Sequence, residues 1–307
     1  MSTTLVSWHG VGADVPENWN IVAASGDAEE GYFRVDGPLG EIAEFRWKKA
    51  KRQPDLELVA DDYLKQVKKS TRRQKDLYEG DIFGRGAKSK GRKQAMQSDV
   101  TFEWTADRQG WGRLIWCFDC KRTVIAQISA PRGMSVRDEA LDILGTLHDH
   151  THDEGVEWGV YGLRYRVPVG VKLIKQRLMS GYLSLNYLGK QGRVIIERWG
   201  LAEDLLTKGF LGWHESLYLA ELQAFRGDSS PVDWDEHEAL QTEGYEGGIA
   251  RLKSLYRAFF LPGRAEKYAS IVWHCPETNR IVGVRAYGKR PLELARSVAS
   301  TVRCHGL

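Results

Sequence analysis

Apolar and polar residues alternate along several short stretches near the start of the chain, which is typical of β-strands with one buried face. One such strand is predicted after Pro16, a second over 31–35, and a third that ends at Trp47. The apolar spacing then becomes helical over 56–67, so an amphipathic helix is predicted there. A hairpin over 114–129 and a closing helix over 140–147 complete the pattern of the first half.

The same landmarks recur in the second half of the chain. Pro16 and Trp47 are 31 residues apart, as are Pro168 and Trp199, and the offset between the two pairs is 152. Several shared positions at a nearly constant offset predict a tandem duplication, because a single matched pair would be expected by chance.

The second half also repeats the order of predicted elements. Helical spacing recurs over 206–224, a hairpin pattern over 270–286 and a helix pattern over 295–302. Strands, helix, strands and helix in each half predict an α+β protein of two tandem homologous domains, each an antiparallel sheet covered by helices. The domains are expected at 1–153 and 154–307.

A family resemblance follows from these elements. The opening Val15–Trp19 segment, the three-strand meander, the mid-domain helix, and the strand over 124–131 that leads into the 138–148 helix resemble the Mog1/PsbP-like α/β/α sandwich. The resemblance covers nearly the whole chain, as a tandem duplication. Members of that superfamily are mostly small non-enzymatic binding or accessory proteins, such as nuclear-transport regulators, photosystem assembly subunits and secretion-effector chaperones. The resemblance therefore implies a binding module, and it names no ligand.

The composition excludes several classes of protein. The 307 residues are 42% apolar and 10% aromatic, which is too apolar for a disordered chain. No run approaches the roughly 18 apolar residues of a membrane span, and the first residues lack a signal-peptide pattern. We therefore expect a cytoplasmic protein with no membrane partner. Four cysteines are too few for a disulfide scaffold, so reduced thiols or a metal site are favoured.

The net charge of +3 conceals two oppositely charged segments. Residues 46–93 contain 16 Lys or Arg against 7 Asp or Glu, whereas residues 228–248 contain 7 acidic residues and no Lys or Arg. We predict a basic insert over about 76–98 in the first domain and an acidic insert over about 226–248 in the second. Such asymmetry is typical of nucleic-acid binding, but also of two surfaces that pair with each other.

These segments supply the candidate binding residues. The basic side chains could follow a phosphate backbone, but few aromatic residues lie among them, so base recognition is not supported. We favour a protein partner or self-association, with nucleic acid as the alternative. The basic candidates are Lys65, Lys68, Lys69, Arg72, Arg73, Lys75, Arg85, Lys88, Lys90, Arg92 and Lys93. The acidic candidates are Asp228, Asp233, Asp235, Glu236 and Glu238.

Cysteine spacing raises the question of a metal. Cys117 and Cys120 form a Cys-x-x-Cys pair at a predicted strand-to-turn junction, which is the spacing of a zinc knuckle. Zinc needs four ligands, and Cys275 and Cys304, each next to a histidine, are the other thiols. A composite zinc site is one hypothesis. The other is that the thiols are reduced or buried as small apolar side chains, since the second half has no Cys-x-x-Cys. No other cofactor is expected.

Catalytic motifs are absent from the sequence. There is no Gly-x-Ser-x-Gly elbow and no His-Glu-x-x-His pair of zinc ligands. We therefore expect a non-catalytic binding or assembly protein that uses its two oppositely charged inserts as a scaffold or accessory surface. A nucleic-acid accessory protein and a zinc-binding protein are the alternatives.

Overall fold

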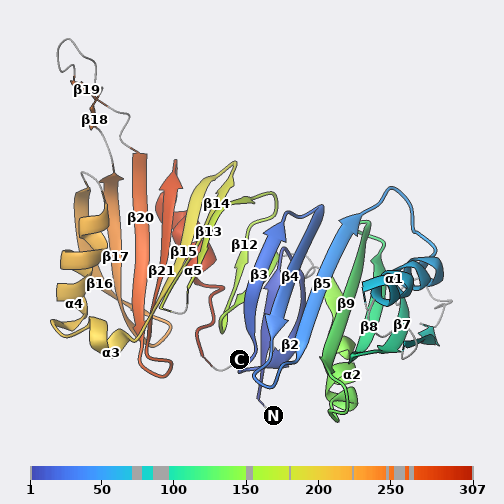
Figure 1. Ribbon diagram of the computed structural model, residues 1–307. Coiled ribbons are helices and arrows are strands. Elements are labelled where there is room, and N and C mark those ends of the chain that lie inside the picture. The colour runs from blue at the N-terminus through green and yellow to red at the C-terminus, as the bar shows by residue number, and fades with distance from the viewer. Residues whose placement is uncertain are drawn as a thin grey trace. The chain divides into compact units, whose positions relative to one another are not determined.

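The computed structural model describes residues 2–70, 78–85, 97–149, 155–179, 181–222, 225–246, 249–251, 260–262 and 266–305. These residues form three large antiparallel sheets with a few short helices (Figure 1). The chain divides into two compact units, residues 1–164 and 165–306, which are described separately. None of the described helices has both the length and the apolar composition that a membrane crossing requires.

A five-stranded sheet begins the first unit, and its strand order is β10-β2-β1-β11-β12. Its strands are β1 (Thr3–Trp8), β2 (Val11–Pro16), β10 (His148–Asp149), β11 (Val156–Val160) and β12 (Leu163–Val167), and the division between the units falls inside β12. The φ angles are 54° at His9 and 79° at Gly10 between β1 and β2, and 53° at Tyr161 and 70° at Gly162 between β11 and β12. Two successive positive φ angles define a type I′ turn, and glycine adopts such angles without steric cost.

The larger sheet of the first unit has the strand order β3-β4-β5-β9-β8-β7-β6. Its strands are β3 (Asn20–Gly26), β4 (Glu30–Asp36), β5 (Ile42–Lys49), β6 (Glu79–Arg85), β7 (Gln97–Thr105), β8 (Arg108–Cys117) and β9 (Arg122–Pro131). Helix α1 (Leu56–Ser70) packs Leu56, Ala60 and Leu64 against β7 and β8 (Figure 1). Helix α2 (Arg137–Gly145) packs against β8, β9 and β2.

The large sheet of the second unit repeats this strand order as β13-β14-β15-β21-β20-β17-β16. Its strands are β13 (Lys172–Leu178), β14 (Tyr182–Gly189), β15 (Gly192–Gly200), β16 (Arg226–Trp234), β17 (His237–Glu246), β20 (Glu266–Cys275) and β21 (Arg280–Gly288). Helix α5 (Pro291–Ala299) packs against β20 and β21. A separate two-stranded sheet is formed by β18 (Ile249–Arg251) and β19 (Phe260–Pro262).

The predicted α+β class, with helix-covered sheets in two tandem domains, is wrong, and so is the resemblance to a Mog1/PsbP-like α/β/α sandwich. The described chain is predominantly β, and its helices are too short to cover the sheets. The described parts of the two predicted inserts, 78–85, 97–98 and 226–246, belong largely to strands β6, β7, β16 and β17, which widen each sheet. Strand β7 continues beyond the insert to Thr105, where Val100, Phe102 and Trp104 are only 5%, 0% and 6% exposed, the alternation of a strand with one buried face.

One predicted helix is broken into short turns. The apolar spacing over 206–224 predicted a single amphipathic helix, but the structure has α3 (Ala202–Leu205), α4 (Gly209–Trp213), a π-helical turn η2 (His214–Tyr218) and a 3-10 turn η3 (Leu219–Glu221). Gly209, where α4 begins, has a φ of 76°, which the interior of a right-handed helix does not adopt, so a continuous helix cannot pass through it.

Other predicted elements are confirmed. Helix α1 covers the spacing found over 56–67, the hairpins β8–β9 and β20–β21 match the two hairpin patterns, and α2 and α5 overlap the closing helix patterns but begin three to four residues earlier. The two large sheets share one strand order, which supports a duplication. The duplication itself, with its boundary after residue 153, stays a prediction.

The turn residue His9, which has a left-handed φ, should make the stability of the fold depend on pH. His9 is 8% exposed, and burial, followed by the nearby Arg122 cation, lowers its pKa to about 4. The unfolded pKa is about 6.5, so neutral His9 stabilises the fold above that pH, and this contribution is lost as the pH falls toward the folded pKa. Asn tolerates the left-handed φ and does not titrate. When the pH is lowered from about 7 to about 4, we expect the free energy of unfolding to fall by about 3 kcal/mol less in His9→Asn than in the wild type.

Urea unfolding at several pH values measures this difference. Equal losses in the two proteins would show that His9 binds a proton as readily in the folded chain as in the unfolded one.

Candidate metal centre

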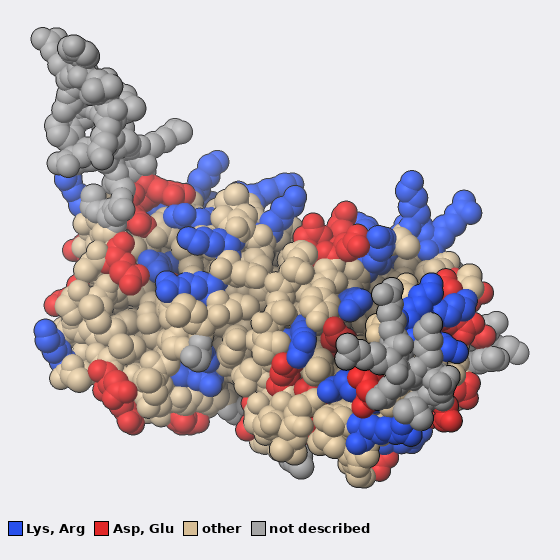
Figure 2. All heavy atoms as spheres, in the orientation of Figure 1, with Lys and Arg blue, Asp and Glu red and all other residues tan. Residues whose placement is uncertain are grey.

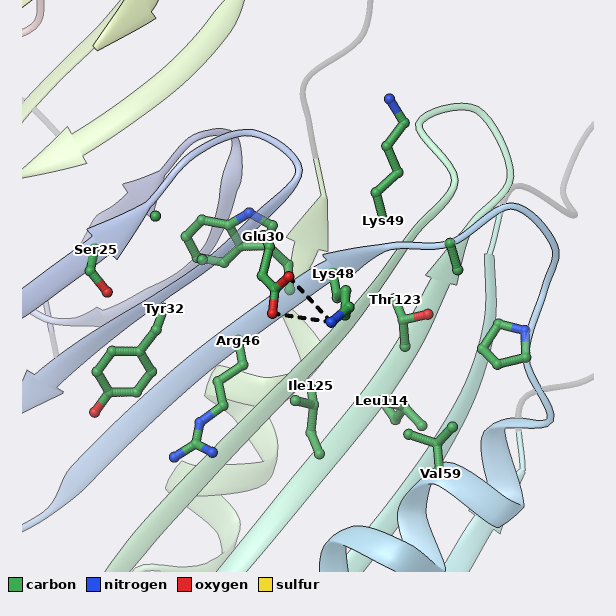
Figure 3. A pocket seen from close by; sticks show the side chains of 15 residues that line it. Ser25, Glu30, Tyr32, Arg46, Lys48, Lys49, Val59, Leu114, Thr123 and Ile125 are labelled. Carbon is green, nitrogen blue, oxygen red and sulfur yellow. Dashed lines mark hydrogen bonds and ion pairs between the residues drawn. The ribbon is translucent and has the colours of Figure 1, made fainter. Parts of the chain in front are cut away.

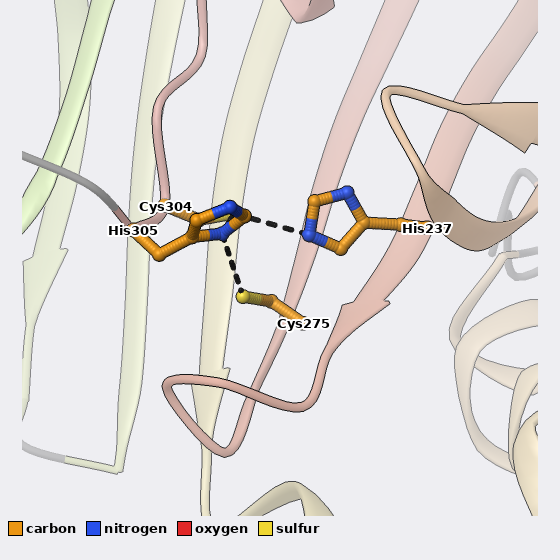
Figure 4. A group of neighbouring side chains, drawn as sticks. All are labelled: His237, Cys275, Cys304 and His305. Atoms are coloured by element: carbon orange, nitrogen blue, oxygen red, sulfur yellow. Dashed lines mark hydrogen bonds between the residues drawn. The ribbon is translucent and has the colours of Figure 1, made fainter.

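Within the described residues, each unit contains a group of His, Cys or Asp side chains whose atoms are close enough to share a metal ion. Within each group the ligand atoms all lie within 4.8 Å of one another. In the second unit they form what we call the histidine–cysteine cluster, which consists of His237, Cys275, Cys304 and His305 (Figure 4). In the first unit they form the cysteine–aspartate cluster, which consists of Cys117, Cys120 and Asp149.

Strand pairing brings the members of the histidine–cysteine cluster together. Strands β17 and β20 pair in an antiparallel register that sets Ala239 opposite Trp273. Continuing this register by two residues on each strand sets His237 opposite Cys275. The segment after α5 supplies Cys304 and His305, and the backbone N–H of Arg166 donates to Thr301 Oγ1 (3.0 Å) just before that segment.

The spacing of these ligand atoms fits a single tetrahedral ion. Nδ1 of His305 lies 3.3 Å from Cys275 Sγ and 3.4 Å from Cys304 Sγ, and Nε2 of His237 lies 3.8 Å from Cys304 Sγ. Tetrahedral zinc with Zn–S bonds near 2.3 Å and Zn–N bonds near 2.0–2.1 Å holds its sulfur and nitrogen ligands about 3.6 Å apart. The observed separations bracket that value, so the four side chains need little movement to share one ion.

Each histidine of the cluster has a second partner that orients its ring. His237 Nδ1 is 3.3 Å from the carbonyl oxygen of Trp234, to which it can only donate, so in the neutral imidazole Nε2 carries the lone pair toward the cysteines. His305 Nε2 is 3.7 Å from Glu277 Oε1, while its Nδ1 faces the two thiols. Metal-binding histidines almost always have a carbonyl or carboxylate partner of this kind.

Burial and mutual contacts set the protonation of the cluster. Cys275 is fully buried and Cys304 is 5% exposed. Burial raises the pKa of the Cys275 thiol, but hydrogen bonds with Thr278 and His237 outweigh burial and lower this pKa to about 6. Burial raises the pKa of Cys304 to about 12. Burial lowers the pKa of His237, yet the hydrogen bond with Cys275 leaves it raised. One thiol is therefore readily deprotonated before any metal binds.

The cysteine–aspartate cluster has a different electrostatic balance. Cys120 Sγ donates to Asp149 Oδ2 (2.5 Å), and Asp149 also forms a buried ion pair with Arg122. Arg122 donates as well to the carbonyl oxygens of His9 (3.1 Å) and Ala28 (3.0 Å). Burial raises the pKa of Asp149 and Arg122 opposes that rise, while the hydrogen bond with Cys117, followed by burial, raises the pKa of Cys120. A guanidinium already neutralises this carboxylate, and the Cys120 thiol stays protonated, so the group suits a metal poorly.

The structure thus divides the four candidate cysteines into two pairs, one in each unit. None of the four forms a disulfide. Of the two histidines that flank cysteines in the sequence, His305 joins a cluster, whereas His274 precedes Cys275 in β20 and so faces the other side of the sheet. Sequence reasoning missed His237, because nothing local to it indicates a ligand until the β17–β20 register is known.

Only some residues of the predicted charged surfaces lie within the described part of the chain. Lys65 pairs with Asp62 (2.9 Å), and Lys68 Nζ lies 5.6 Å from the centre of the Tyr78 ring. Lys69 lies in the last turn of α1 and Arg85 ends β6. The other basic candidates lie outside the described residues and are Arg72, Arg73, Lys75, Lys88, Lys90, Arg92 and Lys93. On the face shown in Figure 2, basic and acidic side chains of the described residues are interspersed. Binding of nucleic acid stays a prediction.

The acidic candidates all lie on the hairpin of β16 and β17. Asp228 and Asp233 are in β16, and Glu238 is in β17. Asp235 and Glu236 form the turn between them, with φ angles of 50° and 67°. This turn immediately precedes His237, so the acidic hairpin and the histidine–cysteine cluster are continuous.

Comparison with known proteins gives no relative: no family model matches the chain, and no curated protein matches it.

The buried ion pair between Arg122 and Asp149 should stabilise the first unit. Arg122 is 5% exposed and Asp149 is 1% exposed, so Arg122→Gln leaves a buried carboxylate without its cation. We expect a loss of about 3 to 5 kcal/mol of unfolding free energy, measured by urea denaturation. The exposed Arg132 in the same unit provides the control, because Arg132→Gln removes the same charge and should cost less than about 0.5 kcal/mol. Similar losses for the two variants would mean that the ion pair does not stabilise the unit.

Proposed function

We propose that this chain is a zinc-binding protein in which the histidine–cysteine cluster binds one structural zinc ion. The proposal rests on one observation, the grouping of two thiols and two imidazoles at the mutual spacing of a tetrahedral ligand shell. Thiolate and imidazole together favour zinc over magnesium or calcium, which prefer oxygen ligands. The thiols must stay reduced, which agrees with the cytoplasmic location expected from the sequence.

The ligand count favours a structural role over a catalytic one. Catalytic zinc sites use three protein ligands and keep a position open for water or substrate, whereas structural sites use four. The histidine–cysteine cluster offers four, and three of its members are buried. Zinc held in this way would add its binding free energy to the stability of the fold.

The metal would also anchor the acidic hairpin. His237 is the first residue of β17 and follows the acidic turn, whereas Cys275 ends β20 and Cys304 follows α5. An ion bound by all of them would join the turn to the end of the sheet and to the C-terminal segment. We infer that the protein acts by non-catalytic binding, with this fixed acidic surface presented to a basic protein partner or to a second copy of the chain.

Metal analysis tests the zinc site. We expect protein purified without chelators, or incubated with equimolar Zn²⁺ and desalted, to contain one zinc per chain by elemental analysis. Cys275→Ser and His237→Ala should lose that zinc. A chelator should lower the melting temperature of the wild type and leave that of Cys275→Ser unchanged, because only a protein that binds metal is stabilised by it.

Cys117→Ser is the matched control, because Cys117 ends β8 as Cys275 ends β20 and both are buried. This variant should keep its zinc. Absence of zinc from the wild type after incubation, or equal loss of zinc in Cys117→Ser and Cys275→Ser, would overturn the proposal.

A further inference from the structure

A groove of about 790 Å³ opens on the larger sheet of the first unit (Figure 3). It lies where β5 pairs with β9, and the paired residues Arg46 and Ile125, and Lys48 and Thr123, all line it. Pro54, which precedes α1, and Val59, in the first turn of α1, line its other side. This volume is in the range of about 300–1,000 Å³ that small-molecule sites occupy.

The floor of the groove between Arg46 and α1 is apolar. Ile125 is paired with both Arg46 and Leu114, so these three side chains share one face of the sheet. Ile125 and Val59 are partly buried and pack against the apolar cluster that contains the buried Leu114. Trp47 follows Arg46 in β5, and its ring lies on the opposite face, near Phe33 and His9. Ile125 and Val59 therefore supply the apolar surface of the groove.

Cations outnumber acids among the lining residues, which include Arg46, Lys48 and Lys49 but, among acidic residues, only Glu30. Lys48 pairs with Glu30 (3.2 Å), and Lys49 pairs with Glu29 (3.2 Å) outside the lining. Neutralisation of these two lysines leaves Arg46 as the cation best placed to bind an anion in the groove.

Arg46 is held in a geometry that suits a carboxylate. Its side chain is 50% exposed, and its guanidinium lies 5.3 Å from the centre of the Tyr32 ring. Its nearest carboxylate, Glu44, is 3.5 Å away and already accepts hydrogen bonds from Tyr32 Oη (2.8 Å) and Gln127 Nε2 (2.6 Å). Because its contact with Glu44 is long, the planar guanidinium of Arg46 can bind a second carboxylate in a bidentate manner.

We propose that this groove binds a fatty-acid-sized organic anion, with an alkyl chain against Ile125, Val59 and Pro54 and a carboxylate at Arg46. The apolar floor excludes a strongly polar ligand, and the available guanidinium selects an anion over a neutral or cationic one. The groove lies within the first unit, so the proposal does not depend on the zinc site of the second.

Calorimetric titration of the full-length protein with dodecanoate, below its micelle concentration, tests the proposal. We expect binding of one dodecanoate per chain, and no measurable binding of dodecyltrimethylammonium, which has the same chain and the opposite charge. Arg46→Gln should weaken dodecanoate binding about tenfold, while Arg132→Gln should leave it unchanged.

A second pair of variants tests the apolar wall. Val59→Glu puts a like charge inside the groove and should abolish dodecanoate binding, whereas Leu58→Glu changes a neighbouring residue of α1 that is 56% exposed and should not. Thermal unfolding checks that both variants are folded; if Val59→Glu is not, Arg46→Gln decides. No binding of dodecanoate, equal binding of the ammonium compound, or unchanged affinity in Arg46→Gln would each overturn the proposal.

Discussion

Each large sheet depends on one long-range strand pairing. Three consecutive strands form a meander, four later strands form the rest, and the two sets meet only where β5 pairs with β9 or β15 pairs with β21. We call these pairings the seams. Formation of a seam brings together segments that are far apart along the chain, so it must outweigh a large loss of chain entropy. The seam therefore sets which side chains lie next to one another on the faces of each sheet.

Buried polar contacts mark both seams. In the first unit, Gln127 of β9 donates to Glu44 of β5 across the seam, and Tyr32 of β4 donates to the same carboxylate. In the second, Tyr182 donates to Glu197 (2.5 Å), and Glu197, which is fully buried, pairs with Arg285. A slip by one residue would turn these groups to the other face and leave a buried charge unpaired, at a cost of several kcal/mol. The polar contacts therefore specify the register, while the apolar residues around them supply most of the stabilisation.

Corresponding positions in the two sheets have acquired different chemistry. Cys117 and Arg122 are paired at the end of the β8–β9 hairpin, as Cys275 and Arg280 are at the end of β20–β21. Beside the first pair, the Asp149 carboxylate forms a buried ion pair with the Arg122 guanidinium. Beside the second lie Cys304 and two histidines, which supply donors for a metal ion instead. Comparable backbone geometry thus holds an ion pair in one unit and zinc-type ligands in the other.

Local spacing in the sequence was enough to predict α1, the hairpins and the closing helices, because strand and helix periodicity depend on neighbouring residues alone. Gly10 and Gly162 recur at the same offset of 152, and the structure shows that each lies in a turn with a positive φ. Only the tertiary structure decided that the charged segments add strands to the sheets and that His237 faces Cys275. These facts depend on pairing between strands that are distant in the sequence, and no local pattern of residues encodes the register of such a pair.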